Sequence, residues 1–392
     1  MHTRQPGRQA PLDPVTSAER DRRRHLGAAG VLGGVLVVGL VVVLAVLNLP
    51  GGSGQQVVPG GTGPPTTAGV PARSLAGAPL LTGFYSAGFE PSECYGSCRP
   101  GDPGAQAEAH DRARIAELAD LHVNFVIHNS SPADWYAASP RSLLAFLGDL
   151  HQHEIGVSYA LASGRTDWFE ASGGFTTRIA EAQFGRTDLD HDGVSDLDGR
   201  IDALYQAHEV LEWATHDHRV AMYQAAKRWF PNTPVVVYYG GLLARTVDPA
   251  SSGEPHRRGG RWADYAYGPG EADIVHVSAD RPFDDGGAYD PAHSAADLRA
   301  SIRIVHRATP HVPIWVHSSF AADRDMRTRP DSMWTPAQLE GWYRAIAPVP
   351  GVRGVFLRSF GRFRYDLANP RFALQRELWR RIGAGAVAGR TP

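Results

Sequence analysis

The sequence predicts an α/β protein whose folded part is a (β/α)8 barrel. Residues 80–383, about 300 in number, are long enough for one large domain, of which α/β barrels are the obvious example. Within them, short apolar runs alternate with longer segments of helical period, which is typical of βαβ units and a parallel sheet. A doubly wound open sheet is the competing fold. It is less favoured because GFYSAG at 83–88 has aromatic residues where a phosphate-binding loop needs close backbone approach.

Seven apolar runs are expected to be strands: 80–85, 123–128, 155–161, 235–239, 274–278, 314–317 and 354–357. Helical patterns occupy 107–121, 140–153, 201–230, 294–309, 335–347 and 370–382. Thr335-Pro336 and Asn369-Pro370 are good helix starts, because a capping oxygen precedes a proline at the first helical position. A barrel needs eight units, and the long segment 162–199 is where the missing one is sought.

The chain before this domain predicts a membrane anchor. A basic segment, 1–25, precedes residues 26–47, which contain no charged or polar side chain, and a spanning helix needs roughly 20 such residues. Arginines stand just before this run and none follows until Arg73. The positive-inside bias therefore predicts a single-pass protein of the cell membrane, with the N-terminus cytoplasmic and the C-terminal domain extracytoplasmic. A cleaved signal peptide is the alternative.

The remaining segments complete this organisation. Residues 48–79 are rich in Gly and Pro and predict a flexible linker, and 384–392 predict a flexible tail. Cys94 and Cys98 are expected to form a local disulfide, since the domain is predicted to be exported. The formal net charge is −2 and no basic stripe is present, which argues against nucleic acid as a partner.

Residues 187–202, TDLDHDGVSDLDGRID, have the acidic spacing of a calcium loop, with Gly193 at the position that requires a sharp turn. This stretch resembles EF-hand-like loops of the dockerin and thrombospondin-repeat kind, which implies a structural Ca²⁺. The implied ligands are four carboxylates and one main-chain carbonyl: Asp188, Asp190, Asp192, Asp196 and Val194. Position 12 is Gly199 instead of Glu, so Asp198 or Asp202 would complete the sphere. An acidic, solvated loop is the alternative interpretation.

The domain also resembles the (β/α)8 glycoside hydrolases of the bacterial cell surface. The segments that carry the resemblance are GFYSAGF, VVVYYGG, IWVHSSF, MWTPAQLEGWY and GVFLRSFGRF. They look like barrel strands that end in aromatic and polar residues, as sugar sites do. The resemblance implies a glycoside hydrolase that acts on a cell-wall or extracellular glycan. The commonest clan places Glu at the ends of its fourth and seventh strands, whereas Tyr239-Gly240 and Arg358-Ser359 stand here.

Candidate site residues follow the expected strands, because function in a barrel lies at the C-terminal strand ends. Glycoside cleavage needs two carboxyl groups, roughly 5 Å apart for retention and roughly 6.5–9.5 Å for inversion. Asp280 with Asp325, or with Asp323, could form such a pair, and Asp167 is a third candidate. The expected substrate-binding residues are Tyr85, His128, Asn129, Trp168, Tyr239, His276, His317 and Arg358.

Two other functions stay open. A non-catalytic carbohydrate-binding barrel is favoured by the missing strand-end Glu. A metal-dependent hydrolase could use the strand-end histidines His128, His276 and His317. The metal interpretation is weaker, because the first strand lacks an H-x-H pair and Lys227 is the single lysine in the sequence.

Overall fold

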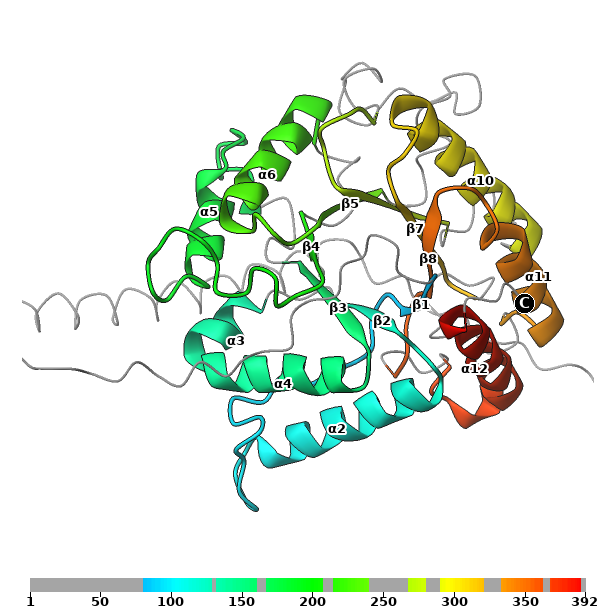
Figure 1. Ribbon diagram of the computed structural model, residues 1–392, viewed down its shortest axis with the longest axis horizontal. Helices are drawn as coiled ribbons and strands as arrows, with labels where there is room; N and C mark the ends of the chain where they lie inside the picture. Colours follow the sequence, from blue (N-terminus) through cyan, green and yellow to red (C-terminus); the bar gives the residue numbers. More distant parts are fainter. Residues whose placement is uncertain are drawn as a thin grey trace, which may run out of the picture. The chain divides into compact units, whose positions relative to one another are not determined.

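The protein folds as a closed barrel of eight parallel strands with helices around it, as the computed structural model in Figure 1 shows. The structure describes residues 80–128, 132–160, 167–206, 214–239, 267–279, 290–320, 333–361 and 367–388. Each strand pairs with the next in parallel, and β8 closes the ring against β1. The (β/α)8 barrel is thereby confirmed as the fold of this domain.

The strands follow one another around the barrel in chain order. They are β1 Leu81–Phe84, β2 Phe125–His128, β3 Gly156–Ala160, β4 Ala203–Tyr205, β5 Val235–Tyr239, β6 Ile274–Ser278, β7 Ile314–Ser318 and β8 Val352–Leu357. The described helices are α2 Ala105–Asp120, α3 Ala133–Ala138, α4 Pro140–Gln152, α5 Arg178–Gly185, α6 His216–Trp229, α10 Pro291–Ala308, α11 Pro336–Ile346, η4 Pro370–Phe372 and α12 Ala373–Val387. They lie outside the strands (Figure 1), as crossover connections between parallel strands require.

The eighth strand is β4, which lies outside the segment 162–199 where we sought it. It falls instead within 201–230, so the expectation of one continuous helix there is wrong. A strand of three residues is too short to show a period of two, and its apolar residues also fit a helical spacing. The helix begins only at His216, where the Thr215 hydroxyl accepts a hydrogen bond from the His218 N–H at 3.3 Å.

The two expected helix starts are confirmed. Thr335 forms a capping box with Gln338 at the start of α11. Asn369 accepts a hydrogen bond from the Arg371 N–H at 3.0 Å and begins η4, which leads into α12. Helix α12 continues to Val387, so the segment predicted as a flexible tail is helical over its first four residues. The predicted disulfide between Cys94 and Cys98 is also present.

Side chains along the strands alternate between the barrel interior and the helical layer. One set of residues, from the eight strands and from the position directly after β1, packs together inside the barrel: Leu81, Tyr85, Phe125, Ile127, Ala160, Ala203, Tyr205, Val236, Tyr238, Ile274, Trp315 and Phe356. The intervening residues, such as Val126, Val157 and Val237, belong to a larger cluster with the helices. This is the period of two that a strand imposes on its side chains.

Three side chains brace neighbouring strands at the N-terminal end of the barrel, and we call them the rim braces. Each stands one residue before an even-numbered strand and accepts a hydrogen bond from a main-chain N–H of the preceding strand. The pairs are Asn124 with Thr82, Asp202 with Val157 and Asp273 with Val235, each at 2.8 Å. A buried N–H left without a partner costs about 1–3 kcal/mol, so these bonds stabilise the strand register.

No helix in the described part of the chain is long and apolar enough to cross a membrane. The predicted anchor at 26–47, together with segments 1–25 and 48–79, lies outside the described residues. The anchor stays a prediction.

Candidate functional site

The C-terminal strand ends are where a (β/α)8 barrel builds its site. The described residues reach the ends of all eight strands. The segments after seven of them lie outside the description: 129–131, 161–166, 207–213, 240–266, 280–289, 321–332 and 362–366. None of the eight strands contains Asp or Glu. The strands themselves therefore offer aromatic, imidazole and hydroxyl groups rather than carboxylates.

Five of these side chains gather inside the C-terminal half of the barrel, and we call them the Tyr–His cluster: Tyr85, Tyr205, Tyr238, His276 and His317. The hydroxyl of Tyr205 lies 2.5 Å from Nδ1 of His276, and Nε2 of His276 lies 2.8 Å from Nδ1 of His317. The ring of Tyr85 stacks on His317 with 4.3 Å between centroids. All five are buried.

The strand pattern explains why these rings meet. Tyr205 ends β4, His276 lies in the middle of β6, and His317 is the fourth residue of β7. Tyr238 of β5 lies 4.9 Å from the His276 ring, between centroids, and its hydroxyl donates to Ser278 at 2.9 Å. Burial raises the pKa of Tyr205 well above its ordinary value, with a smaller contribution from Tyr85, so Tyr205 keeps its proton.

Three expected substrate-binding residues, His128, Trp168 and Tyr239, lie outside this cluster. His128 is on the outward face of β2, where its ring lies 5.1 Å from that of Tyr159 and 6.1 Å from that of Phe89. Trp168 is buried, and its indole N–H donates to the carbonyl of Gln206 at 3.2 Å. The structure therefore brings Tyr85, His276 and His317 together and leaves His128 and Trp168 against other parts of the core.

Tyr239 takes part in a buried ion pair on the outward face of β5. Arg219 of α6 donates to both carboxylate oxygens of Glu271, from Nε at 2.8 Å and from a terminal nitrogen at 2.9 Å. The hydroxyl of Tyr239 donates to the same carboxylate, and the Gly268 N–H donates to it at 3.0 Å. With Arg219 and Glu271 fully buried, this arrangement ties α6 to the segment before β6.

The candidate catalytic carboxylates are mostly beyond the described residues. Asp280, Asp323 and Asp325 lie there, as does Asn129, so their roles stay predictions. Asp167 is described, and its carboxylate accepts a hydrogen bond from the Gln183 amide at 2.7 Å.

Two described residues extend the cluster toward the predicted site. The N–H of Ala279, the residue directly before Asp280, donates to the His317 carbonyl at 3.1 Å. Arg358, expected to bind substrate, follows β8, and its main-chain N–H donates to the carbonyl of Ser318 at 3.1 Å. Both β6 and β8 are therefore tied to the end of β7 where they leave the barrel.

Sequence reasoning missed Tyr205 because it lay within a predicted helix. Tyr238 was expected only as part of the strand segment VVVYYGG, with no role of its own. The signal that could have found both is a polar aromatic residue at an inward position of a strand, and that position depends on knowing the strand bounds.

The three strand-end histidines do not form one metal site. His128 faces the helical layer, whereas His276 and His317 face the interior and bind each other. Within the described ranges, the one group of side chains with metal-binding spacing is acidic and lies elsewhere: Asp188, Asp190 and Asp192. The described residues therefore do not support a metal site built from all three strand-end histidines.

The acidic loop turns as the calcium-loop pattern requires. Ligand oxygens of Asp188, Asp190 and Asp192 lie within 4.8 Å of one another. Gly193, with φ of 88°, provides the sharp turn, and its N–H donates to Asp188 at 3.1 Å. The Asp192 N–H lowers the pKa of Asp190, but desolvation and the charges of Asp192 and Asp196 leave that pKa raised. Three carboxylates that repel one another are a suitable setting for a hard cation.

The residues expected to complete the calcium sphere are engaged elsewhere. Asp198 accepts hydrogen bonds from the N–H groups of Asn232 and Thr233, at 3.1 and 2.8 Å. Asp202 is one of the rim braces and also lies 2.9 Å from the His151 ring. Asp196, one of the five implied ligands, accepts its hydrogen bond within the loop itself, from the Leu189 N–H at 2.8 Å. The expectation that Asp198 or Asp202 joins the cluster is not supported, because their oxygens already serve the backbone.

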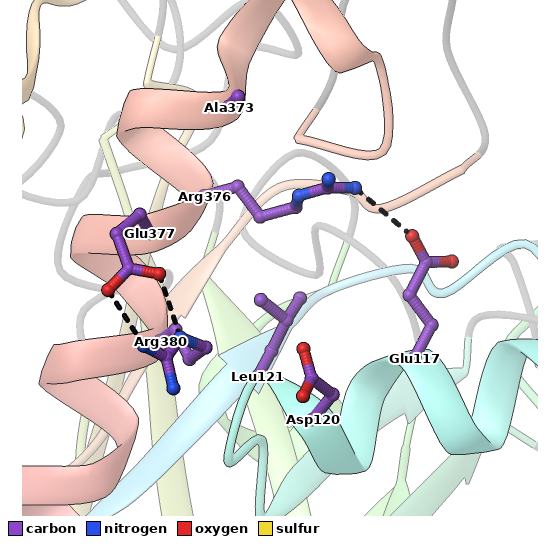
Figure 2. A pocket seen from close by; sticks show the side chains of 7 residues that line it. All are labelled: Glu117, Asp120, Leu121, Ala373, Arg376, Glu377 and Arg380. Carbon is purple, nitrogen blue, oxygen red and sulfur yellow. Dashed lines mark hydrogen bonds and ion pairs between the residues drawn. The ribbon is translucent and has the colours of Figure 1, made fainter.

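A pocket of about 350 Å³ lies on the outside of the barrel between α2 and α12 (Figure 2). Its charged side chains pair with each other: Arg376 reaches Glu117 at 3.4 Å, and Arg380 binds Glu377 at 2.8 Å. No strand end contributes to its lining. We therefore place the candidate site at the Tyr–His cluster and not in this pocket.

No family model and no curated protein sequence matches the chain. The endo-β-1,4-mannanase of Thermotoga petrophila has a similar structure, with 12% identity over 81% of this chain and 79% of that chain and a TM-score of 0.50. The GH2 β-galacturonidase of Eisenbergiella tayi gives 12% identity, 77% and 51% coverage and a TM-score of 0.47. This chain thus spans about half the length of that galacturonidase. At such identities the likeness concerns the fold alone, an eight-stranded parallel barrel that glycoside hydrolases also have.

Proposed function

We propose that this protein is a glycoside hydrolase that acts at the C-terminal end of its barrel. The Tyr–His cluster carries the proposal. The interior of a (β/α)8 barrel is mostly filled by branched apolar side chains, whereas its C-terminal half here holds two histidines and three tyrosines. Such rings offer the hydrogen bonds and flat faces by which proteins hold sugars. The shared fold with the mannanase is consistent with this function but does not set the substrate.

The proposed chemistry uses two carboxyl groups. Asp280 follows Ala279, which is bound to the His317 carbonyl, and Asp325 or Asp323 comes after β7. One carboxyl group would act as the acid and the other as the base or nucleophile. Asp167 is the third candidate for a catalytic carboxylate. His317, Tyr85 and Arg358 are the proposed sugar contacts at the described strand ends.

The protein is further proposed to act outside the cytoplasm and to hold a structural Ca²⁺. The disulfide between Cys94 and Cys98 suits an oxidising compartment, in keeping with an anchor at 26–47 and action on a cell-wall or extracellular glycan. A structural Ca²⁺ would be held by the acidic loop. Its ligands would be Asp188, Asp190, Asp192, Asp196 and the main-chain carbonyl of Val194. The convergence of three carboxylates within 4.8 Å supports this assignment.

A non-catalytic carbohydrate-binding barrel is the second candidate. The observation that favours it is the absence of Asp and Glu from all eight described strands. It would use the same aromatic and imidazole groups to hold a glycan, and the carboxylates beyond the strands would take no part.

The deciding experiment measures release of reducing ends by the full chain from β-1,4-mannan, polygalacturonate and glucuronide-containing glycans. Asp280→Asn should lower turnover on the cleaved glycan by several orders of magnitude, on the scale of losing a catalytic acid or base, about 10²–10⁴-fold or more. Asp120→Asn, which changes an exposed carboxylate at the end of α2, should leave turnover unchanged. Binding without cleavage by the unaltered chain would establish the binding barrel instead, and full activity of Asp280→Asn would remove Asp280 from the mechanism.

A further inference from the structure

Three side chains of the Tyr–His cluster form a hydrogen-bonded row across the barrel interior. The row runs from the Tyr205 hydroxyl to Nδ1 of His276, at 2.5 Å, and from Nε2 of His276 to Nδ1 of His317, at 2.8 Å. Each of these two hydrogen bonds contains one proton, which belongs to one of its two heavy atoms. A neutral imidazole carries one N–H donor and one acceptor nitrogen, so the direction of the first hydrogen bond determines the second.

The first hydrogen bond has a definite direction. Tyr205 is buried and keeps its proton, because burial raises the pKa of its hydroxyl well above the ordinary value. Within the described part of the chain, His276 is the hydrogen-bond partner of that hydroxyl. A buried O–H without an acceptor costs about 1–3 kcal/mol, so the hydroxyl donates and Nδ1 of His276 accepts. His276 then carries its proton on Nε2 and donates to Nδ1 of His317.

We propose that Tyr205 fixes His276 and His317 as neutral Nε2–H tautomers and thereby makes His317 a hydrogen-bond donor in the C-terminal half of the barrel. Tyr205 and His276 are positioning residues, since they act through His317. A proton added to Nδ1 of either imidazole would set two donors face to face at 2.5 or 2.8 Å. Neither histidine can therefore serve as a general base through this row, and His317 cannot bind a metal through Nε2.

The described surroundings of the row are aromatic. Among the described residues, Tyr85 stacks on His317, and the aromatic rings around His276 are those of Tyr85, Tyr205, Tyr238, Trp315 and Phe356. An imidazolium here would be desolvated beside neutral aromatic groups. One consequence rests on the proposed function: acid–base chemistry falls to carboxylates, and His317 donates to an oxygen of the sugar, a hydroxyl or a carboxylate. The tautomer assignment itself does not depend on glycan cleavage.

Nitrogen-15 NMR of the full chain, labelled at histidine and held in detergent, tests the assignment directly. The sequence has 17 histidines, so His276→Gln and His317→Gln variants identify the two signals. Both should show a proton on Nε2 and a lone pair on Nδ1, unchanged from pH 7.5 to 5.5, whereas an exposed histidine titrates near pH ~6.5. An Nδ1–H form at either residue, or titration of either within that range, would overturn the proposal.

A matched pair of variants tests the part assigned to Tyr205. Tyr205→Phe removes the donor to His276, so His276 and His317 should lose their single tautomer pattern. Tyr238→Phe removes a hydroxyl that donates to Ser278 instead, and the pattern should stay as in the unaltered chain. A wild-type pattern in Tyr205→Phe would refute the role of Tyr205. If Tyr205→Phe does not fold, the wild-type spectrum still decides the tautomers. Absence of glycan cleavage would count against the proposed function and leave this readout intact.

Discussion

Asp111 in helix α2 is a buried carboxyl group that is only half satisfied. Its Oδ1 accepts a hydrogen bond from the Glu90 N–H at 2.7 Å and lies 3.2 Å from the His110 ring, while Oδ2 has no hydrogen-bond partner among the described residues. Burial raises its pKa to about 6, although the bond from Glu90 acts in the opposite direction. An unfolded Asp titrates near pH ~3.9, so between these values the folded protein binds the extra proton. Stability is therefore lost as pH rises from ~4 to about 6.

We expect Asp111→Asn to stabilise the protein at neutral pH. Asn keeps an acceptor for the Glu90 N–H and carries no charge to desolvate. The gain should be on the order of 2 kcal/mol above pH 6, a rise of a few degrees in Tm, and should vanish below pH ~4. Thermal melts at pH 4 and 7.5 measure it, with Asp120→Asn as the exposed control. An equal change in Tm at both pH values would contradict the burial argument.

Removing a charge from the buried Arg219–Glu271 pair should have the opposite effect, a loss of folding stability. Glu271→Gln removes the carboxylate charge that two nitrogens of the buried Arg219 guanidinium bind, and breaking a buried pair costs about 3–5 kcal/mol. The control is Glu340→Gln, which removes an exposed i,i+4 pair with Arg344 worth about 0.5 kcal/mol or less. Chemical denaturation compares the two. Similar losses in both variants would show that Arg219 is better solvated than its burial implies.

Among the elements, the acidic loop is coupled to the shortest strand. The loop ends at Asp202, the rim brace directly before β4, and its Ser195 N–H donates to the carbonyl of Trp229 at 2.8 Å. A cation that binds only the folded loop stabilises it by mass action. We expect Tm to rise with millimolar Ca²⁺ and to fall with a chelator. An Asp190→Ala, Asp192→Ala double variant should lose this response, and a response equal to that of the unaltered chain would exclude these ligands.

The sequence could predict elements better than the directions in which their side chains point. The bounds of β5 and β6 agree with expectation, because long buried runs between turn residues leave little choice. The sequence did not predict the direction in which the His128 side chain points. The fourth residue of β2 faces outward, whereas the fourth residue of β7 faces inward. The inward face begins at the first residue of β2, Phe125, but at the second residue of β7, Trp315, and this difference cannot be read from one sequence. The candidate carboxylates remain sequence predictions for a different reason: they follow the strands in segments outside the described residues.

For the whole molecule, the anchor prediction gives a simple test of orientation. Protease added to intact cells should release a soluble fragment of about 300 residues, because the Gly- and Pro-rich segment 48–79 precedes the barrel. The fragment is detected with an antibody to the domain. A cytoplasmic protein serves as the control and should stay intact. Protection of the domain until the cells are lysed would show that the topology is wrong.

The rim braces should slow amide hydrogen exchange at three positions of the barrel. The N–H groups of Thr82, Val157 and Val235 are each held by the side chain that directly precedes the next strand, so they exchange with solvent only when that hydrogen bond opens. At the fourth pair the residue before β8 is Gly351, which has no side chain, and Ile314 donates to its carbonyl at 2.9 Å. Among the described residues, β7, the strand that carries His317, is thus held to β8 at this rim by a backbone hydrogen bond where the other three pairs use a side chain, so we expect the Ile314 amide to exchange earlier than those of Thr82, Val157 and Val235.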